Sequence, residues 1–274
     1  MTKNLTLTNA SYRQIPTPTS VAVVGKHSAL VKKLCRKLGF KIEQKHPEMV
    51  VTFGGDGTIL HSERLYPGVP KLCARFSQHC LKCGVGTYFH SKLHHGEHVS
   101  LLHSSAALEA ALKKISSRKS VRVKLEEKLQ ATVKRKGKEI FHATALNEVQ
   151  VHNKNPLHAI RGVACVGSNC QTFIGDGVIV ATPFGSTGYF YSVTQKSFKK
   201  GVGMAFNNPT TKTPPVIGEL EGKGVRIFIE RRNGLLICDN DPKMFLLAAR
   251  DEIVVKKSKQ NAWFVHSSKT TRMI

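Results

Sequence analysis

The amino-acid sequence predicts an α/β plus β fold: a Rossmann-like α/β domain followed by a β-rich, β-sandwich domain. In the first part, apolar runs of strand length alternate with segments of helical spacing, which favours a parallel sheet with connecting helices. After the polar stretch "SSRKS" at residues 116–120, short segments of alternating apolar residues follow one another, separated by Gly, Asn and Asp. We therefore place the α/β domain over residues 1–116, the β-rich domain over 117–256 and a C-terminal tail over 257–274.

The α/β domain opens with a strand and a helix. Val21–Val24 is an apolar run that ends at Gly25, as expected of a buried strand. Ser28 is a suitable N-cap for the helix that follows, and Gly39 is a suitable end. Between them, apolar residues recur at helical spacing, at Leu30, Val31, Leu34 and Leu38.

A second strand-and-helix pair follows. We expect a strand from Phe40 and another at Met49–Phe53, which runs into Gly54. Ile59 then opens a helix that ends before Pro67, because proline disrupts a helix interior.

The remaining elements are one helix and many strands. Ser105–Ile115 carries apolar residues on one helical face. From residue 121 onward, apolar and polar residues alternate, as they do in strands with one buried face. The expected strands are Val121–Leu125, Leu129–Val133, Phe141–Ala145, Val178–Ala181, Val225–Ile229, Leu235–Cys238, Phe245–Ala248 and Ile253–Val255.

Composition limits the class of protein. The chain has 274 residues, of which 41% are hydrophobic, as in globular proteins. The sequence contains no apolar run long enough to cross a membrane and no export signal, so we expect a cytoplasmic protein that does not bind membranes. The seven cysteines are odd in number, and in that compartment reduced thiols are expected rather than disulfides.

The chain is strongly basic, with a formal net charge of +24. Such a charge attracts polyanions, which include nucleic acid but also nucleotides and polyphosphate. The basic residues are scattered along the chain, and only 7% of the residues are aromatic, which is few for a base-stacking surface. The charge by itself therefore does not select among these partners.

The most informative local stretch is "VVTFGGDGTIL", residues 50–60. A strand that runs into glycines and a helix start places backbone N–H groups and a helix dipole where an anion binds. The phosphate-binding candidates are Gly54, Gly55, Gly57 and Thr58. The same residues also suit a tight turn with a helix cap.

Asp56, in the middle of this loop, favours a chemical role. A carboxylate at about 4 Å from a phosphate charge costs on the order of 4 kcal/mol at an effective dielectric constant of 20. A loop that only held phosphate would not keep that side chain. Two roles offset the cost: contact with Mg²⁺ or another divalent cation, or acceptance of the proton from an attacking hydroxyl group during phosphoryl transfer.

Two further stretches identify a resemblance. Asn147-Glu148 lies between apolar residues, and "GDGVIVATPFGSTGY" follows at residues 175–189. Together with GGDGT at 54–58, these motifs in this order resemble the NAD kinase family. The resemblance implies an α/β domain, a β-rich domain and a tail that returns to the first domain. It also implies Mg²⁺-dependent phosphorylation of NAD to NADP, with ATP or polyphosphate as donor, in a homodimer or homotetramer.

The resemblance also implies roles for individual residues. Asp56 would be the base that activates the 2′-hydroxyl of the adenosine ribose of NAD. Asn147 and Glu148 would bind the adenine-side nucleoside, and Asp176 would bind the nicotinamide end. The dinucleotide pocket would be lined by Thr182, Ser186, Thr187, Gly188, Tyr189 and Ser192. Each residue taken singly has a plain structural alternative, and their order along the chain favours the functional interpretation.

The chain departs from the family pattern in several places. Family members usually carry a stretch with glycine and asparagine where this chain has Cys73 and Arg75, so Arg75 is a candidate phosphate ligand that acts by charge. A lysine-rich segment replaces the glycine pair that usually follows the position of Ser192. The usual Asp-Gly-Gln turn is here Asp239-Asn240-Asp241.

Cysteines and histidines gather in residues 73–98, and the pair Cys80 and Cys83 has the spacing of half a zinc site. A second such pair is absent from the sequence, and reduced cysteines are commonly buried as small apolar residues. We assign no metal to this segment; a zinc site would use Cys73, His79, Cys80 and Cys83.

Two alternatives to an NAD kinase stay open. A kinase of another hydroxylated metabolite or of a lipid would use the same scaffold. A non-catalytic basic protein that binds nucleic acid would explain the charge, but it would not need four polar residues at the positions of Asp56, Asn147, Glu148 and Asp176.

Overall fold

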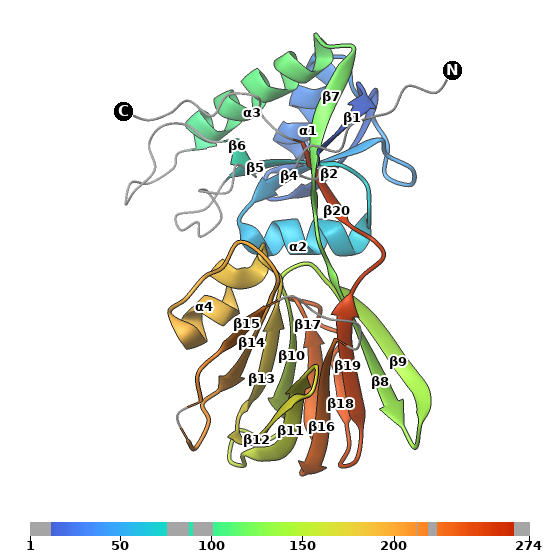
Figure 1. The fold of residues 1–274 in the computed structure, drawn as a ribbon. Coiled ribbons are helices and arrows are strands. Elements are labelled where there is room, and N and C mark those ends of the chain that lie inside the picture. Colours follow the sequence, from blue (N-terminus) through green and yellow to red (C-terminus); the bar gives the residue numbers. More distant parts are fainter. Residues whose placement is uncertain (1–11, 76–87, 90–100, 212, 219–223, 266–274) are drawn as a thin grey trace, which may run out of the picture. The chain divides into compact units, whose positions relative to one another are not determined.

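The structure is a computed structural model that describes residues 12–75, 88–89, 101–211, 213–218 and 224–265. The chain divides into two compact units (Figure 1). The first comprises Met1–Glu126 together with Ala262–Ile274, and the second comprises Glu127–Asn261. Within the described ranges, no helix is both long and apolar enough to cross a bilayer.

The first unit is built on an eight-stranded sheet. Its strand order is β1-β7-β20-β5-β4-β2-β3, with β6 added beside β5. The strands are β1 (Tyr12–Pro16), β2 (Ser20–Gly25), β3 (Lys41–Ile42), β4 (Met49–Gly54), β5 (Lys71–Arg75), β6 (Tyr88–Phe89), β7 (Ser120–Glu126) and β20 (Ala262–Val265). From β3 to β6 the neighbouring strands pair in parallel, which confirms the predicted α/β character of this part.

Helices cover both faces of this sheet. Apolar residues of α1 (Ser28–Lys37) and α3 (Leu101–Ser116) pack with Val51 and Leu72 in the main core of the unit. Val50 points to the opposite face, where Tyr66 packs just after α2 (Asp56–Leu65). The alternation of side chains along β4 thus gives the sheet two buried faces, as parallel sheets require.

Three helix starts differ from the sequence-based expectation. α1 begins at Ser28 itself, and its N-cap is His27 in a left-handed conformation with φ 51°, so the prediction of Ser28 as the cap was wrong. α3 begins at Leu101, before the expected Ser105. α2 begins at Asp56 rather than at Ile59, so the glycine loop itself forms the first turn of the helix.

The second unit is a sandwich of two six-stranded antiparallel sheets, as predicted. One sheet has the order β15-β14-β13-β10-β17-β18 and the other β12-β11-β16-β19-β8-β9. The strands of the first are β10 (Glu148–Asn153), β13 (Gly177–Ala181), β14 (Val202–Asn207), β15 (Val216–Gly218), β17 (Gly234–Cys238) and β18 (Phe245–Leu247). Those of the second are β8 (Leu129–Arg135), β9 (Lys138–Ala145), β11 (Ile160–Val166), β12 (Asn169–Gly175), β16 (Val225–Arg231) and β19 (Glu252–Lys257).

One hydrophobic core fills the space between these sheets. It combines Val149 and Val180 of the first sheet with Val133, Ile227 and Ile253 of the second. The short helix α4 (Tyr189–Thr194) packs on the outer face of the first sheet, where Phe190 contacts Ile179 and Ala205. Figure 1 shows α4 beside β13 and β14.

The boundary between the units lies at Glu126, later than the expected residue 116. β7 belongs to the first unit because it pairs with β1 and with β20 of the C-terminal segment. β20 also pairs with β5, so Ala262–Val265 join the first sheet between β5 and β7. The alternating pattern of residues 121–125 predicted a strand correctly, but it could not indicate which sheet the strand would join.

The expectation that all cysteines are reduced thiols was wrong for one pair. Cys165 and Cys170 form a disulfide across the β11–β12 hairpin, where they are direct register partners. Their Cα atoms are 4.0 Å apart. The sequence separation of five residues did not identify the pair, because the position of the turn decides which residues face each other.

Candidate active site

The glycine loop joins the buried strand β4 to α2 in the first unit. Gly55 is the N-cap of α2 and Asp56 is its first residue. A Cβ atom on Gly54 would lie 2.2 Å from the Thr58 hydroxyl oxygen, so only glycine permits this close approach. Thr58 also donates its backbone N–H to the carbonyl oxygen of Gly55 at 3.0 Å. The loop therefore holds a tight turn, with Gly57 exposed at the helix N-terminus.

Two other strand ends lie beside this loop. Gly54 pairs in register with Arg75 on β5, and Phe53 pairs with Gly25 on β2. The carboxyl ends of these parallel strands therefore meet at one edge of the sheet, where open α/β sheets bind ligands. The structure places the backbone of Arg75 next to the glycine loop, and its role as a phosphate ligand stays a prediction.

Lys26 follows β2 at the same edge and was not singled out from the sequence. Its backbone N–H donates to the Phe53 carbonyl oxygen at 2.9 Å, and its side chain is exposed. The signal in the sequence was a strand that ends in Gly25 and a basic residue. That pattern alone is too common to indicate a phosphate contact.

Asp56 is half-buried in the first turn of α2, where the helix dipole favours a negative charge. On the neighbouring strand β5, burial raises the pKa of the Cys73 thiol to about 12. The charge of Asp56 also raises this pKa, whereas the Thr52 hydrogen bond and the charge of Lys71 lower it. The Cys73 side chain is therefore a neutral thiol at physiological pH.

The suggested zinc ligands are only partly described. Cys73 is buried on β5, and His79, Cys80 and Cys83 lie outside the described residues. In the part of the chain that the structure describes, no three His, Cys, Asp or Glu side chains come together as a metal site.

A buried ion pair connects α2 to the start of β5. Lys71, fully buried at the start of β5, forms a salt bridge with Glu63 of α2. The Lys71 ammonium also donates to the carbonyl oxygens of Tyr66 and Val69 at 2.9 and 2.7 Å. These bonds tie the end of α2 and the following turn to the strand next to β4.

In the second unit, Asn147 and Glu148 stand at the start of β10 and are both buried. The carboxylate of Asp239, which follows β17, accepts the backbone N–H groups of this turn. The distances to the nitrogens of Leu146, Asn147 and Glu148 are 2.7, 2.7 and 3.1 Å. Burial raises the pKa of Asp239, and the three N–H donors act in the opposite direction.

The turn between β13 and α4 packs on the same two residues. Thr182 donates its backbone N–H to the Asn147 carbonyl oxygen at 2.9 Å, and its hydroxyl donates to the Leu146 carbonyl oxygen at 2.6 Å. A Cβ atom on Gly185 would lie 2.1 Å from the Asn147 carbonyl oxygen. A Cβ atom on Gly188 would lie 3.2 Å from Asn147 Nδ2 and 3.3 Å from Glu148 Oε2. The structure thus brings the two motifs of this unit into contact.

The Asn147 side chain has an acceptor available within this contact. Its Oδ1 atom is buried and has no hydrogen-bond partner among the described residues. Buried polar atoms in folded proteins are nearly always paired. Partly exposed residues, Thr187, Gly188 and Tyr189, follow in the adjoining turn.

The hydroxyl groups of this segment serve different neighbours. Ser186 is buried and donates to the carbonyl oxygens of Pro183 and Phe198 at 2.8 and 3.0 Å, so it holds the turn. The Tyr189 hydroxyl accepts from Asn207 Nδ2 at 2.8 Å. Ser192 is exposed, and its hydroxyl lies 3.4 Å from the Gly188 carbonyl oxygen.

Asp176 lies apart from this cluster. It precedes β13, whereas Asn147 and Glu148 face the other end of that strand, since Glu148 pairs with Ala181. Five residues of strand correspond to about 17 Å at 3.3–3.4 Å per residue. The Asp176 carboxylate accepts from the amide groups of Asn153 and Asn208 at 3.0 and 3.1 Å. Within the second unit, the structure therefore does not bring Asp176 to the Asn147–Glu148 pair.

Comparison with known proteins identifies the relatives of this chain. Residues 114–267, more than half of the chain, match the family model described as the ATP-NAD kinase C-terminal domain. A protein from Sulfurisphaera tokodaii described as NAD kinase is 28% identical over 249 residues, which cover 86% of this chain and 87% of that protein.

Solved structures share the fold. A crystal structure of yeast NADH kinase complexed with NADH has a TM-score of 0.71 at 18% identity and covers 93% of this chain and 85% of its own. A crystal structure of an NAD kinase from Archaeoglobus fulgidus in complex with ATP has a TM-score of 0.65 at 21% identity, with coverage of 91% and 94%. At this level of identity the likeness shows the fold alone.

Proposed function

Because the chain belongs to the NAD kinase family, we propose that it transfers the γ-phosphoryl group of ATP to the 2′-hydroxyl of the adenosine ribose of NAD, giving NADP. Phosphorylation of NAD is the activity of this enzyme. We propose three further points: which hydroxyl group accepts the phosphoryl group, which molecule donates it, and which residues take part.

The buried, unpartnered Oδ1 atom of Asn147 is the observation that supports the nucleoside site most directly. An amide oxygen accepts a hydrogen bond, and ribose hydroxyls and exocyclic amines donate one. Glu148, buried beside it, adds a carboxylate acceptor that suits ribose hydroxyl groups. Thr187, Gly188 and Tyr189 would line the remainder of the dinucleotide pocket.

Asp56 acts as the base in the proposed reaction. The 2′-oxygen of NAD attacks the γ-phosphorus of ATP, and its proton passes to the Asp56 carboxylate as the O–P bond forms. The bond between the γ-phosphorus and the bridging oxygen of ADP breaks, and ADP leaves with the electron pair. The amides at the N-terminus of α2, the Arg75 side chain and Lys26 would offset the phosphate charge.

The donor set of the loop suits Mg²⁺. This ion is commonly held by one or two carboxylates, with substrate phosphates and waters as the other ligands. Asp56 is the carboxylate that would hold Mg²⁺. When bound, the ion would neutralise charge on the transferred phosphoryl group. We also propose, from the family resemblance, that the enzyme is cytoplasmic and forms a homodimer or homotetramer.

The experiment is to incubate the full chain with NAD and Mg-ATP and to detect NADP with an NADP-specific dehydrogenase. Polyphosphate in place of ATP tests the donor, and NADH in place of NAD tests the acceptor. A panel of nucleosides, polyol phosphates and lipids with labelled ATP tests the alternative that another hydroxylated metabolite is the substrate. Transfer to a panel member, with no NADP formed, would overturn the proposal.

A further inference from the structure

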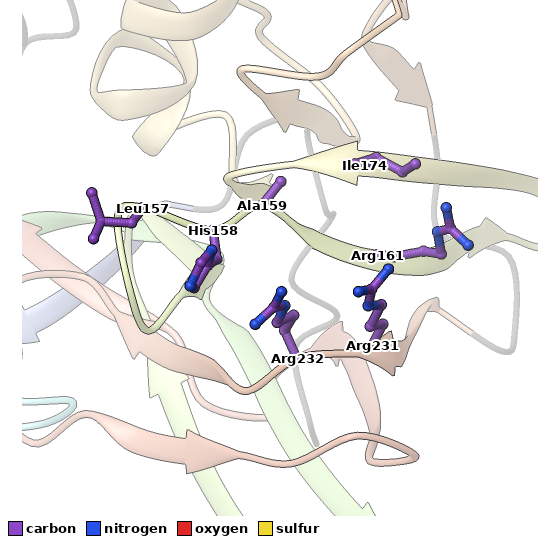
Figure 2. Close-up of a pocket in the computed structure, with 7 residues that line it drawn as sticks. All are labelled: Leu157, His158, Ala159, Arg161, Ile174, Arg231 and Arg232. Carbon is purple, nitrogen blue, oxygen red and sulfur yellow. The ribbon is translucent and has the colours of Figure 1, made fainter.

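A cluster of basic side chains surrounds two adjoining hollows in the second unit. The first, of about 200 Å³, is lined by Arg161, Arg231 and Arg232 together with His158 and Ile174. The second, of about 470 Å³, is lined by Lys154 and Asn233 and shares His158 and Arg232 with the first. Figure 2 shows the three arginines and His158 around the first hollow. None of these basic residues takes part in the proposed phosphoryl transfer.

Two of the arginines are paired on adjacent strands, next to a shift in the strand register. Arg161 of β11 and Arg231 of β16 are direct register partners in an antiparallel pair. Like charges at opposed positions destabilise a sheet, unless a counter-charge lies between them. Within the described part of the chain none of the three arginines forms a salt bridge, and neither hollow has an acidic residue in its lining.

The third arginine occupies a backbone conformation that does not suit it. Arg232 is the first residue of the tight turn between β16 and β17 and has φ 75°. Asn and Gly are strongly preferred at such positions, because other residues crowd their own backbone there. The left-handed backbone of Arg232 is therefore unfavourable, and it lies beside the unfavourable pairing of Arg161 with Arg231.

We propose that these hollows form a binding site for a short oligophosphate anion, which would supply the missing negative charge. Guanidinium groups bind phosphate oxygens through paired hydrogen bonds, and three arginines line the first hollow. Lys154 and His158 extend the positive surface into the second hollow. The combined hollows fall in the size range of small-ligand sites.

The lining favours a phosphate chain over nucleic acid. Neither hollow is lined by a Phe, Tyr or Trp side chain on which a base could stack.

The site lies near Asp176, because Asn153 donates to both the Asp176 carboxylate and the His158 carbonyl oxygen. The inference goes beyond the proposed function, since binding of an oligophosphate here requires no phosphoryl transfer.

The chain offers a matched pair of variants for the test. Arg232→Asn removes a charge from the site and places a residue that tolerates the left-handed conformation. Arg250→Asn makes the same change at another left-handed arginine of the same unit, with φ 73°, that lines neither hollow. Both variants lower the net charge equally, and both are expected to fold at least as stably as the wild type.

Binding of inorganic tripolyphosphate to the full chain is measured by isothermal titration, and hydrogen exchange locates the protected amides. We expect protection of residues 154–161 and 231–234, a loss of affinity of about tenfold in Arg232→Asn, and wild-type affinity in Arg250→Asn. Equal weakening in both variants, or protection confined to the glycine loop, would overturn the proposal. So would a single-stranded RNA that binds these residues more tightly than tripolyphosphate does.

Discussion

Asp239 accepts the backbone N–H of Asn147 at 2.7 Å, although 92 residues separate the two in the chain. With the bonds from Leu146 and Glu148, one buried carboxylate satisfies three consecutive amides of the turn that carries the predicted nucleoside ligands. Asp239 therefore holds the turn, and in the proposed reaction it would position Asn147 and Glu148 for the substrate.

Asp239→Asn tests this role. An asparagine at this position accepts with one oxygen and turns an NH₂ group toward backbone donors, so at least one buried N–H loses its partner. We expect a stability loss of about 1–3 kcal/mol in urea unfolding and a raised KM for NAD, with a smaller effect on the KM for ATP. Asp241→Asn, two residues later, is the matched control. Equal changes in both KM values would indicate a purely structural role.

Asp56→Asn tests the proposed base. The amide keeps the size of the side chain but cannot accept the hydroxyl proton, so turnover should fall by about 10²–10⁴-fold. The affinity for NAD, measured by titration, should remain close to that of the wild type. If the variant turned over near the wild-type rate, Asp56 would not be the base. The description of the fold would not change.

Asn147→Leu separates stability from binding. The buried Oδ1 atom lacks a partner in the described residues, so an apolar side chain of similar size should leave the free energy of unfolding unchanged or raise it by about 1 kcal/mol. The same change should raise the KM for NAD about tenfold or more, because the acceptor for the nucleoside is lost. A destabilised variant with an unaltered KM would mean that Asn147 serves the fold instead.

Lys71→Met tests the buried ion pair between α2 and β5. Removal of the ammonium leaves the Glu63 carboxylate buried without its counter-charge, which should cost about 3–5 kcal/mol of unfolding free energy. The double variant Glu63→Gln/Lys71→Met should recover part of this loss. Lys113→Met, at a mostly exposed partner of Glu109, should cost only about 0.3–0.5 kcal/mol. Similar losses at Lys71 and Lys113 would contradict the expectation.

Acid should weaken the second unit through Asp251. Burial raises the pKa of this carboxyl, but hydrogen bonds from Arg135 and from the Ala248 N–H lower it by more. The pKa in the folded state therefore lies below the usual 3.8. The native state then binds fewer protons than the unfolded state, so this contribution to stability is present above about pH 4 and is lost as the pH falls through the folded-state pKa.

The measurement is urea unfolding as a function of pH for the wild type and Asp251→Asn. The difference in unfolding free energy between the two proteins should shrink toward acid pH. A difference that stays constant from neutral pH to about pH 3 would show that the Asp251 carboxylate is not the group that titrates.

Local patterns predicted much of the architecture. The parallel strands, the positions of α1 and α2 and the sandwich strands follow from apolar periodicity and from glycines at strand ends, which act over a few residues. The exact helix starts were missed where a residue such as His27 adopts an unusual backbone conformation. Propensity alone does not favour such a conformation, and packing of the surrounding chain has to stabilise it.

The sequence by itself determined the chemistry of each motif: a carboxylate in an anion loop, an Asn-Glu pair at a strand start, and glycines where backbones approach closely. Only the tertiary structure decided which motifs meet. It joined Asp239 to Asn147, paired Cys165 with Cys170, and placed Asp176 at the far end of β13. The reason is that strand register and sheet order depend on side-chain packing between segments distant in the chain, which no local stretch encodes alone.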